Sequence, residues 1–255
     1  MSATRTDRIR TAFGAAAEHY EAHAGVQRTV AQTLAQLARN QPLPARPRIL
    51  EIGCGTGLLT RELRAIFPDA EMTVTDLSPA MVAQASRDPA LAARFLVMDG
   101  EHPDFDAPWF DLIVSSLAFQ WFADLPAALA RLYGLLRPGG CLMFATMAQD
   151  SFCEWRAAHE AHGAEAGTPA YPDIASLKAM LDAHADAFLF EEHYTENFGG
   201  ARGLHRHLKG IGATVPAEGR APLAPSVLRK VMASFDAAGG TVTYHVAFGR
   251  VTRLS

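Results

Sequence analysis

Cysteine is scarce in this chain of 255 residues, and metal-binding patterns are missing. Cys54, Cys141 and Cys153 are too few and too widely spaced for a disulfide framework or a cysteine-based zinc site. The histidines also lack the spacing of metal ligands, so we expect no metal site. Reduced cysteines are typical of the cytosol, and we expect a cytoplasmic protein.

Long apolar runs and an excess of positive charge are missing too. No run reaches the roughly 18 apolar residues of a membrane-spanning helix, and residues 1–14 lack the apolar core of a secretory signal. The formal net charge of −4 provides no positive field, so we expect neither nucleic acid nor a membrane as a partner. An apolar content of 49% is enough for one large domain, or one domain with a lid.

The most informative feature that is present is a glycine turn. Apolar residues 48–52 lead into Gly53, Gly55 and Gly57, and a helical apolar pattern follows. Glycine allows positive φ and lets a ligand lie against the backbone, while the next helix offers free N–H groups. The spacing G-x-G-x-G differs from the dinucleotide fingerprint. With Asp76 at the end of the next apolar stretch, the turn resembles the S-adenosyl-L-methionine site of class I methyltransferases.

Apolar patterns of strand and helix type alternate through the first half of the chain. This alternation predicts an α/β fold with a Rossmann-like, mostly parallel sheet and helices on both faces. Two N-terminal helices are expected within 7–39, and a helix stop and turn at 135–140. The expected strands are 48–52, 71–76, 94–98, 110–116 and 140–146, and the expected helices are 57–67, 79–86 and 124–136.

The pattern breaks after about residue 148, which predicts four regions. They are an N-terminal helical cover (1–40), a cofactor-binding core (46–148), lid and substrate-binding insertions with late core elements (149–240) and a final antiparallel strand of the core sheet (241–255). Within the insertions we expect helices at 151–166, 174–184, 201–211 and 226–237 and a strand at 187–198. Such insertions can cover a site, exclude water and hold substrate.

Candidate cofactor-binding residues lie at the ends of the predicted strands, where open α/β sheets bind ligands. Asp76 is suited to accept two hydrogen bonds from a ribose diol, although it could instead cap the next helix. Asp99 resembles the residue that accepts the adenine amino group in this superfamily; the alternative is a turn aspartate. The full set of candidates is Gln27, Glu51, Gly53, Cys54, Gly55, Gly57, Asp76, Leu77, Asp99, Gly100 and Ser115.

Four further segments narrow the family. Residues 13–20 (FGAAAEHY), 116–121 (SLAFQW), 207–213 (HLKGIGA) and 243–249 (TYHVAFG) resemble the malonyl-acyl-carrier-protein O-methyltransferases of biotin synthesis. Two departures are Ala15 and Ser116, where family members often carry Arg and Asn. The resemblance implies methyl transfer from S-adenosylmethionine to the free carboxylate of malonyl on acyl-carrier protein or on coenzyme A. The ester hides a charge, so that fatty-acid enzymes can extend the chain toward pimelate.

The acceptor side is less defined. A carboxylate is ionised near neutral pH and needs no general base, so the protein must position it and exclude water. The basic segment 202–209 could hold the carboxylate, dock an acidic carrier, or simply be a solvated helix face. Two other functions stay open: methylation of a small-molecule hydroxyl or carbon, and a non-catalytic assembly factor. The positioning candidates are Tyr20, Gln120, Trp121, Arg202 and Lys209, and none is assigned as acid or base.

Overall fold

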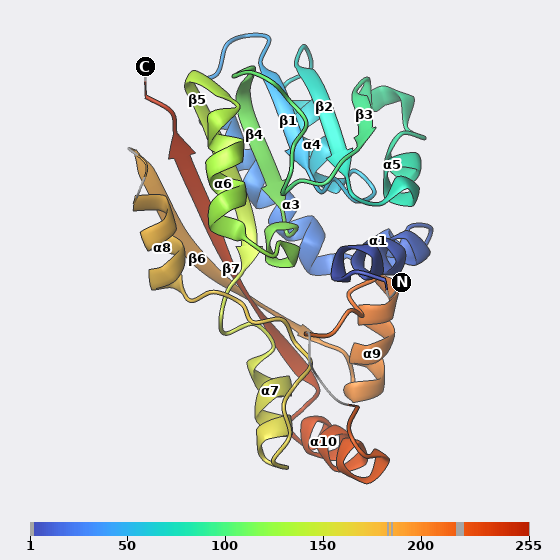
Figure 1. The fold of residues 1–255 in the computed structure, drawn as a ribbon. Helices are drawn as coiled ribbons and strands as arrows, with labels where there is room; N and C mark the ends of the chain where they lie inside the picture. Colours follow the sequence, from blue (N-terminus) through green and yellow to red (C-terminus); the bar gives the residue numbers. More distant parts are fainter. Residues whose placement is uncertain (1–2, 183, 185, 218–221, 255) are drawn as a thin grey trace.

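The computed structural model describes residues 3–182, 184, 186–217 and 222–254, and its centre is one seven-stranded sheet (Figure 1). The strand order is β3-β2-β1-β4-β5-β7-β6. The first five strands are parallel, and β7 is antiparallel to both β5 and β6. The predicted mostly parallel sheet with an antiparallel final strand is therefore confirmed. The bounds are β1 Arg48–Ile52, β2 Glu71–Asp76, β3 Arg94–Val97, β4 Phe110–Ser116, β5 Leu136–Met147, β6 Ala187–Asn197 and β7 Thr241–Thr252.

Helices cover both faces of the sheet, because the central strands are apolar on both sides. In β1, Ile49 packs in the core shared with α3 and α4, whereas the next residue, Leu50, packs in the core shared with α6 and α8. This alternation is the two-residue period of a strand. The helices are α1 Arg5–Ala16, α2 Tyr20–His23, α3 Gly25–Arg39, α4 Leu58–Ile66, α5 Pro79–Ala85, α6 Leu125–Gly134, α7 Cys153–Glu160, α8 Ile174–Asp182, α9 Ala201–Gly210 and α10 Pro225–Ala237, with short 3-10 turns η1 Pro89–Leu91 and η2 Phe119–Trp121.

Three predicted elements differ from the structure. The turn expected at 135–140 is wrong: β5 begins at Leu136, and its pairing with β4 jumps from Phe110↔Leu136 to Leu112↔Cys141. Gly139 takes a φ of +80° inside this irregularity, so the Pro-Gly pair makes a bulge and no chain reversal. The helix expected at 151–166 is only α7, and the N-terminal region contains the extra short helix α2.

Long strands and peripheral helices extend the molecule beyond the core sheet. In Figure 1, β6 and β7 run past the ends of the parallel strands, and α7, α9 and α10 gather around their far part. Trp155 of α7 joins this group, with its ring edge-on to Phe235 of α10 at 5.2 Å between centroids. Helix α1 lies beside the ends of the short parallel strands β1, β2 and β3 (Figure 1). The parallel strands and these added helices thus face each other across the region where candidate site residues gather.

Candidate functional site

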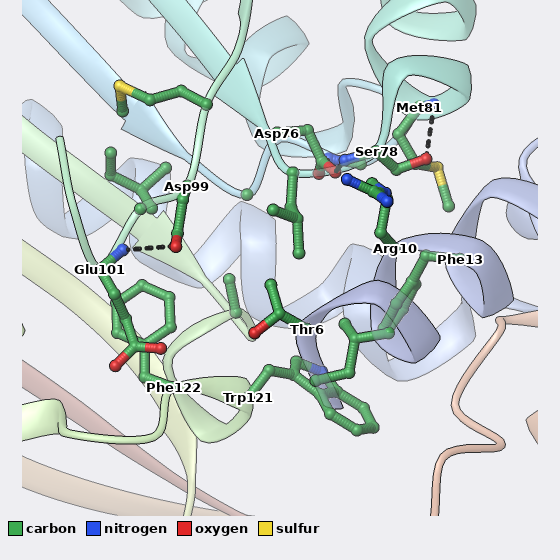
Figure 2. Close-up of a pocket in the computed structure, with 18 of the residues that line it drawn as sticks. Thr6, Arg10, Phe13, Asp76, Ser78, Met81, Asp99, Glu101, Trp121 and Phe122 are labelled. Atoms are coloured by element: carbon green, nitrogen blue, oxygen red, sulfur yellow. Dashed lines mark hydrogen bonds between the residues drawn. The ribbon is translucent and has the colours of Figure 1, made fainter. Parts of the chain in front are cut away.

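A cavity opens at the carboxyl ends of β1, β2 and β4 and is closed on one side by α1 (Figure 2). It encloses about 810 Å³ of empty space, including its open mouth. Among the candidates from the sequence, those that line it are Tyr20, Gly53, Gly55, Asp76, Leu77, Asp99, Gly100 and Trp121.

Gly55 leaves open space in the glycine turn. Its φ is +55°, and a Cβ built on it would meet no atom within 4 Å, so a side chain there would project into the cavity. Gly53 and Gly57 differ, since a Cβ on Gly53 would lie 2.4 Å from the Ala118 Cβ, and one on Gly57 would rest against Ala85. Two of the glycines therefore serve packing, and Gly55 provides the surface against which a ligand can lie.

Asp76 is fixed at the floor of the cavity by two backbone N–H groups. Gly55 N donates to Oδ2 at 2.9 Å and Ser78 N donates to Oδ1 at 2.8 Å. Burial raises the pKa of Asp76, and these two hydrogen bonds partly oppose that effect. The cap of α5 is Ser78, whose Oγ accepts from Met81 N. The alternative that Asp76 caps this helix is therefore wrong, and each of its oxygens keeps a lone pair for a ligand.

Asp99 combines the two interpretations that the sequence left open. It lines the cavity, yet its Oδ1 accepts from Glu101 N at 3.0 Å and its Oδ2 lies 3.1 Å from His102 Nδ1. The turn passes close to β1, because a Cβ on Gly100 would lie 2.3 Å from the Ile52 Cγ2. The turn bonds hold Asp99 in place at the cavity (Figure 2).

Four cofactor candidates lie beneath the cavity and do not line it. Glu51 is 1% exposed, and its carboxylate accepts from Thr60 Oγ1 at 2.7 Å. Ser115 is fully buried and donates to the Ile52 carbonyl, whereas its neighbour Ser116 lines the cavity. Burial raises the pKa of the Cys54 thiol far above its usual range, which makes it a poor nucleophile. With Gly57, these residues support the turn from below.

Helix α1 contributes a face that the sequence did not assign. Thr6, Ile9, Arg10 and Phe13 follow the i, i+3, i+4, i+7 spacing and all line the cavity. Figure 2 shows the Arg10 side chain extending toward the Asp76–Ser78 turn. The spacing could have identified this face, but the sequence does not say which other elements the face meets. Two contacts hold α1 in place: the rings of Phe13 and Trp121 meet edge to face at 5.3 Å, and Arg5 donates to the Trp121 carbonyl.

A second, larger cavity adjoins the first. It encloses about 2080 Å³ of empty space, including open solvent, and extends between α7, α9, β7 and η2. Aromatic and apolar side chains dominate its wall, among them Phe152, Trp155 and Tyr171. The residues that line both cavities are Phe13, Tyr20, Leu117 and Trp121. We call these four residues the shared wall, because a ligand in either cavity contacts it.

Of the remaining candidates, Gln27, Gln120 and Lys209 line the second cavity, and the exposed Arg202 lies outside both. Gln27 is 9% exposed, and within the described part of the chain its Oε1 has no hydrogen-bond partner. Gln120 is already bonded, since its Nε2 donates to the Leu117 carbonyl and its Oε1 accepts from Thr146 Oγ1. Gln27 is therefore the buried amide that still needs a ligand or water.

Tyr20 and His207 are both neutral near neutral pH. Burial raises the pKa of Tyr20 above its usual range, with the nearby carboxylates adding to the effect. Burial lowers the pKa of His207 to about 4, and its Nε2 lies 2.9 Å from the Tyr244 hydroxyl, which lines the second cavity. Neither side chain supplies a charge near neutral pH.

Among the described residues, no helix is long and apolar enough to cross a membrane.

Comparisons with known proteins agree with this geometry. Residues 49–140 match the family model described as a methyltransferase domain. The chain is 39% identical over 254 residues to the malonyl-[acyl-carrier protein] O-methyltransferase of Magnetococcus marinus, covering 98% of this chain and 93% of that protein. The same name is carried by a Salmonella typhimurium relative that is 36% identical and matched over 99% and 100% of the two chains.

A longer relative and two solved structures complete the comparison. The chain is 49% identical over 243 residues to the biotin biosynthesis bifunctional protein BioCD of Bordetella avium, covering 95% of this chain but only 51% of that relative. Phosphoethanolamine N-methyltransferase 2 of Haemonchus contortus, solved with S-adenosylhomocysteine, has a TM-score of 0.63 at 17% identity, covering 100% and 61% of the chains. YcgJ of Bacillus subtilis has a TM-score of 0.62 at 14% identity, covering 88% of this chain and 98% of YcgJ. These structures show that the fold is shared.

The burial of Glu51 predicts a change of stability with pH. Burial raises the pKa of Glu51 to about 7 from an ordinary 4.5. The folded state therefore binds more protons than the unfolded state between these values, and stability falls as the pH rises through that window. Full ionisation costs on the order of 3 kcal/mol. We expect Glu51→Gln to be more stable than the wild type above the window and to lose this advantage below it.

Urea unfolding at the two ends of the window measures this difference. The exposed Glu18→Gln is the matched control and is expected to follow the wild type at both pH values. A difference between Glu51→Gln and the wild type that stays constant with pH would contradict a buried carboxyl that titrates near neutrality.

Proposed function

The chain belongs to the malonyl-[acyl-carrier protein] O-methyltransferase family, and we propose that it methylates the free carboxylate of malonyl-acyl-carrier protein with S-adenosylmethionine as the donor. The product is a malonyl methyl ester for biotin synthesis. One observation carries the proposal: the cavity lined by Gly55, Asp76 and Asp99 and a larger apolar cavity meet at the shared wall defined above. Donor and acceptor can therefore approach each other from opposite sides.

The residues of the first cavity fit the donor. The open space at Gly55 accommodates a ligand against the backbone, and the immobilised Asp76 carboxylate offers paired acceptors to a ribose diol. Asp99 would accept the adenine amino group, with Leu77 and Gly100 alongside. The bound donor supplies an activated methyl group on a sulfonium. Glu51, Cys54 and Ser115 would act indirectly, by supporting the turn.

The second cavity would receive the malonyl group and part of its carrier arm. A carboxylate oxygen would form the new O–CH3 bond as the S–CH3 bond of the donor breaks and the sulfur leaves as a neutral thioether, so no proton would have to move. The carboxylate should be held through one oxygen by neutral donors, because an ion pair at the attacking oxygen would lower its nucleophilicity. The Gln27 Nε2 and the Tyr20 hydroxyl would donate to that oxygen, whereas the unpartnered Gln27 Oε1 only accepts and requires water or another donor. The aromatic wall excludes water.

The same features argue against the two other functions. Transfer to a hydroxyl or carbon usually requires a base at the reacting atoms. Tyr20, the titratable residue of the shared wall, is protonated near neutral pH, and burial raises its pKa further. A non-catalytic assembly factor would not require two cavities that share a wall, together with a fixed Asp76. The carboxylate acceptor therefore fits the site best.

The acceptor prediction compares two carriers that differ in one group. We expect methylation of malonyl-acyl-carrier protein and none of acetyl-acyl-carrier protein, since acetyl lacks the free carboxylate. Methyl transfer from labelled donor, followed by mass measurement of the carrier, checks this. Equal labelling of both carriers would mean that another atom is the nucleophile and would refute the carboxylate mechanism.

The cofactor prediction concerns Gly55 and Asp76. Gly55→Val should abolish S-adenosylmethionine binding, because the branched side chain would fill the open space and strain the positive-φ turn. Asp76→Ala should weaken binding by roughly 1.5–3 kcal/mol through the loss of hydrogen bonds to a charged group. Calorimetry on folded variants measures both. Wild-type affinity in Asp76→Ala would remove this residue from the site.

Helix α9 yields a prediction about carrier docking. Arg202 and Arg206 are exposed and one turn apart, while Lys209 of the same helix lines the second cavity. Carrier proteins of fatty-acid synthesis are acidic, and this chain carries a net charge of −4, so a local basic surface has to offset repulsion. Arg202→Glu with Arg206→Glu should raise the KM for malonyl-acyl-carrier protein and leave the KM of a short malonyl thioester almost unchanged.

Charge-matched and salt controls separate docking from other effects. Arg39→Glu with Arg87→Glu alters two exposed arginines outside α9 by the same charge and should have little effect on either substrate. The preference for the carrier should also shrink with added salt, since screening shortens to about 10 Å at 0.1 M. An equal loss of activity on both substrates in the α9 variant would mean that the substitutions affect folding or the chemical step, and it would refute the docking role.

A further inference from the structure

A cluster of metal-ligand side chains lies outside both cavities. Asp150 follows β5, His193 is on β6 and His245 is on β7, and one ligand atom from each lies within 4.8 Å of the others. His245 is 1% exposed, whereas Asp150 and His193 are exposed to solvent. The proposed methyl transfer does not use any of the three.

Strand register creates this cluster. The antiparallel pairing of β6 with β7 sets His193 opposite His245, and the two rings stack at 4.3 Å between centroids. The segment with Asp150 is bound to the same point of β7: Ala148 N donates to the His245 carbonyl at 2.8 Å, and Ser151 Oγ donates to it at 2.9 Å. Strand pairing and these hydrogen bonds thus hold the backbone of all three residues close together.

The two nitrogens of His245 have different partners. Nε2 lies 2.5 Å from Glu191 Oε2, which only accepts hydrogen bonds when ionised, so Nε2 carries the proton. Nδ1 accepts a long bond of 3.3 Å from Asp150 N and lies 3.5 Å from Asp150 Oδ2. With the proton on Nε2, the Nδ1 lone pair faces Asp150, and a metal bound there would replace the long bond from Asp150 N. A carboxylate behind a histidine in this way is the usual support of a metal ligand.

We propose that Asp150, His193 and His245 bind a divalent transition metal of the zinc class, with Glu191 orienting His245. Ligand atoms about 2.1 Å from tetrahedral zinc lie roughly 3.4 Å apart, and the 3.5 Å between His245 Nδ1 and Asp150 Oδ2 matches this spacing. The other ligand atoms lie within 4.8 Å of one another, and the exposed side chains of Asp150 and His193 would have to rotate to bring them closer. Two imidazoles select against magnesium and calcium, which require oxygen ligands, and water completes the coordination.

Such a metal would join three segments that are far apart in the chain. The segment that contains Asp150 leads directly into Phe152 and α7, which form part of the wall of the second cavity. Coordination would fix this segment to the β6–β7 pair without any contact with the donor cavity. The expected effect is therefore on stability, and this site stands whether or not the acceptor is a malonyl carboxylate.

Zinc titration of the untagged full chain after chelator dialysis tests the site. We expect one tight equivalent by calorimetry and a rise of Tm with zinc. His193→Ala and Asp150→Asn alter exposed side chains and should abolish both effects. Glu191→Gln should weaken zinc binding by about 10–100-fold, as expected for a residue that supports a ligand.

Two controls address binding elsewhere on the chain. His19→Ala removes an exposed histidine from the turn between α1 and α2, and Cys153→Ser removes the partly buried thiol near the cluster. Both should bind zinc as the wild type does. The proposal is overturned if the wild type takes up no tight equivalent, if His193→Ala binds zinc unchanged, or if Cys153→Ser loses it.

Discussion

The edge-to-face contact between Phe13 and Trp121 is the interaction on which the site depends. It joins α1 to the turn after β4, so that α1 closes the first cavity and the same two rings form a boundary of the second. Without this contact the two cavities would lose their common wall, and donor and acceptor would lose their alignment. The fixed Asp76 and the open space at Gly55 define the donor side of that wall. The acceptor side is apolar, with the Gln27 amide as its buried group in need of a partner.

Local patterns in the sequence predicted most of the sheet, and long-range packing accounts for the errors. Strands β1, β2 and β4 have the predicted bounds, because apolar runs between turns reflect burial on both faces. The β5 bulge at Gly139 was missed, since Pro-Gly is typical of a turn and only pairing with a neighbour shows that the strand continues. Of the two serines that end β4, Ser115 is buried and Ser116 lines the cavity, because the direction of each side chain depends on the sheet.

Residues from distant segments could be identified as candidates but not grouped. Gly55, Asp76 and Asp99 follow successive strands, so the parallel sheet brings them together as predicted. The α1 face, by contrast, reaches the cavity only through tertiary packing. The metal-ligand cluster is the clearest case: His193 and His245 show no ligand spacing along the chain and become neighbours only through the β6–β7 register. The same holds for the two candidates on α9: Lys209 lines the second cavity, whereas Arg202 lies on the surface, and only the packing of the helix distinguishes them.

A crystal structure of the protein with S-adenosylhomocysteine and a stable malonyl-pantetheine analogue tests the shared wall most directly. The account predicts the homocysteine sulfur beside Tyr20 in the first cavity and the malonyl carboxylate in the second, in line with the missing methyl group. It also predicts that the Gln27 amide contacts that carboxylate. A nucleoside bound away from Asp76, or a carboxylate bound outside the second cavity, would contradict it.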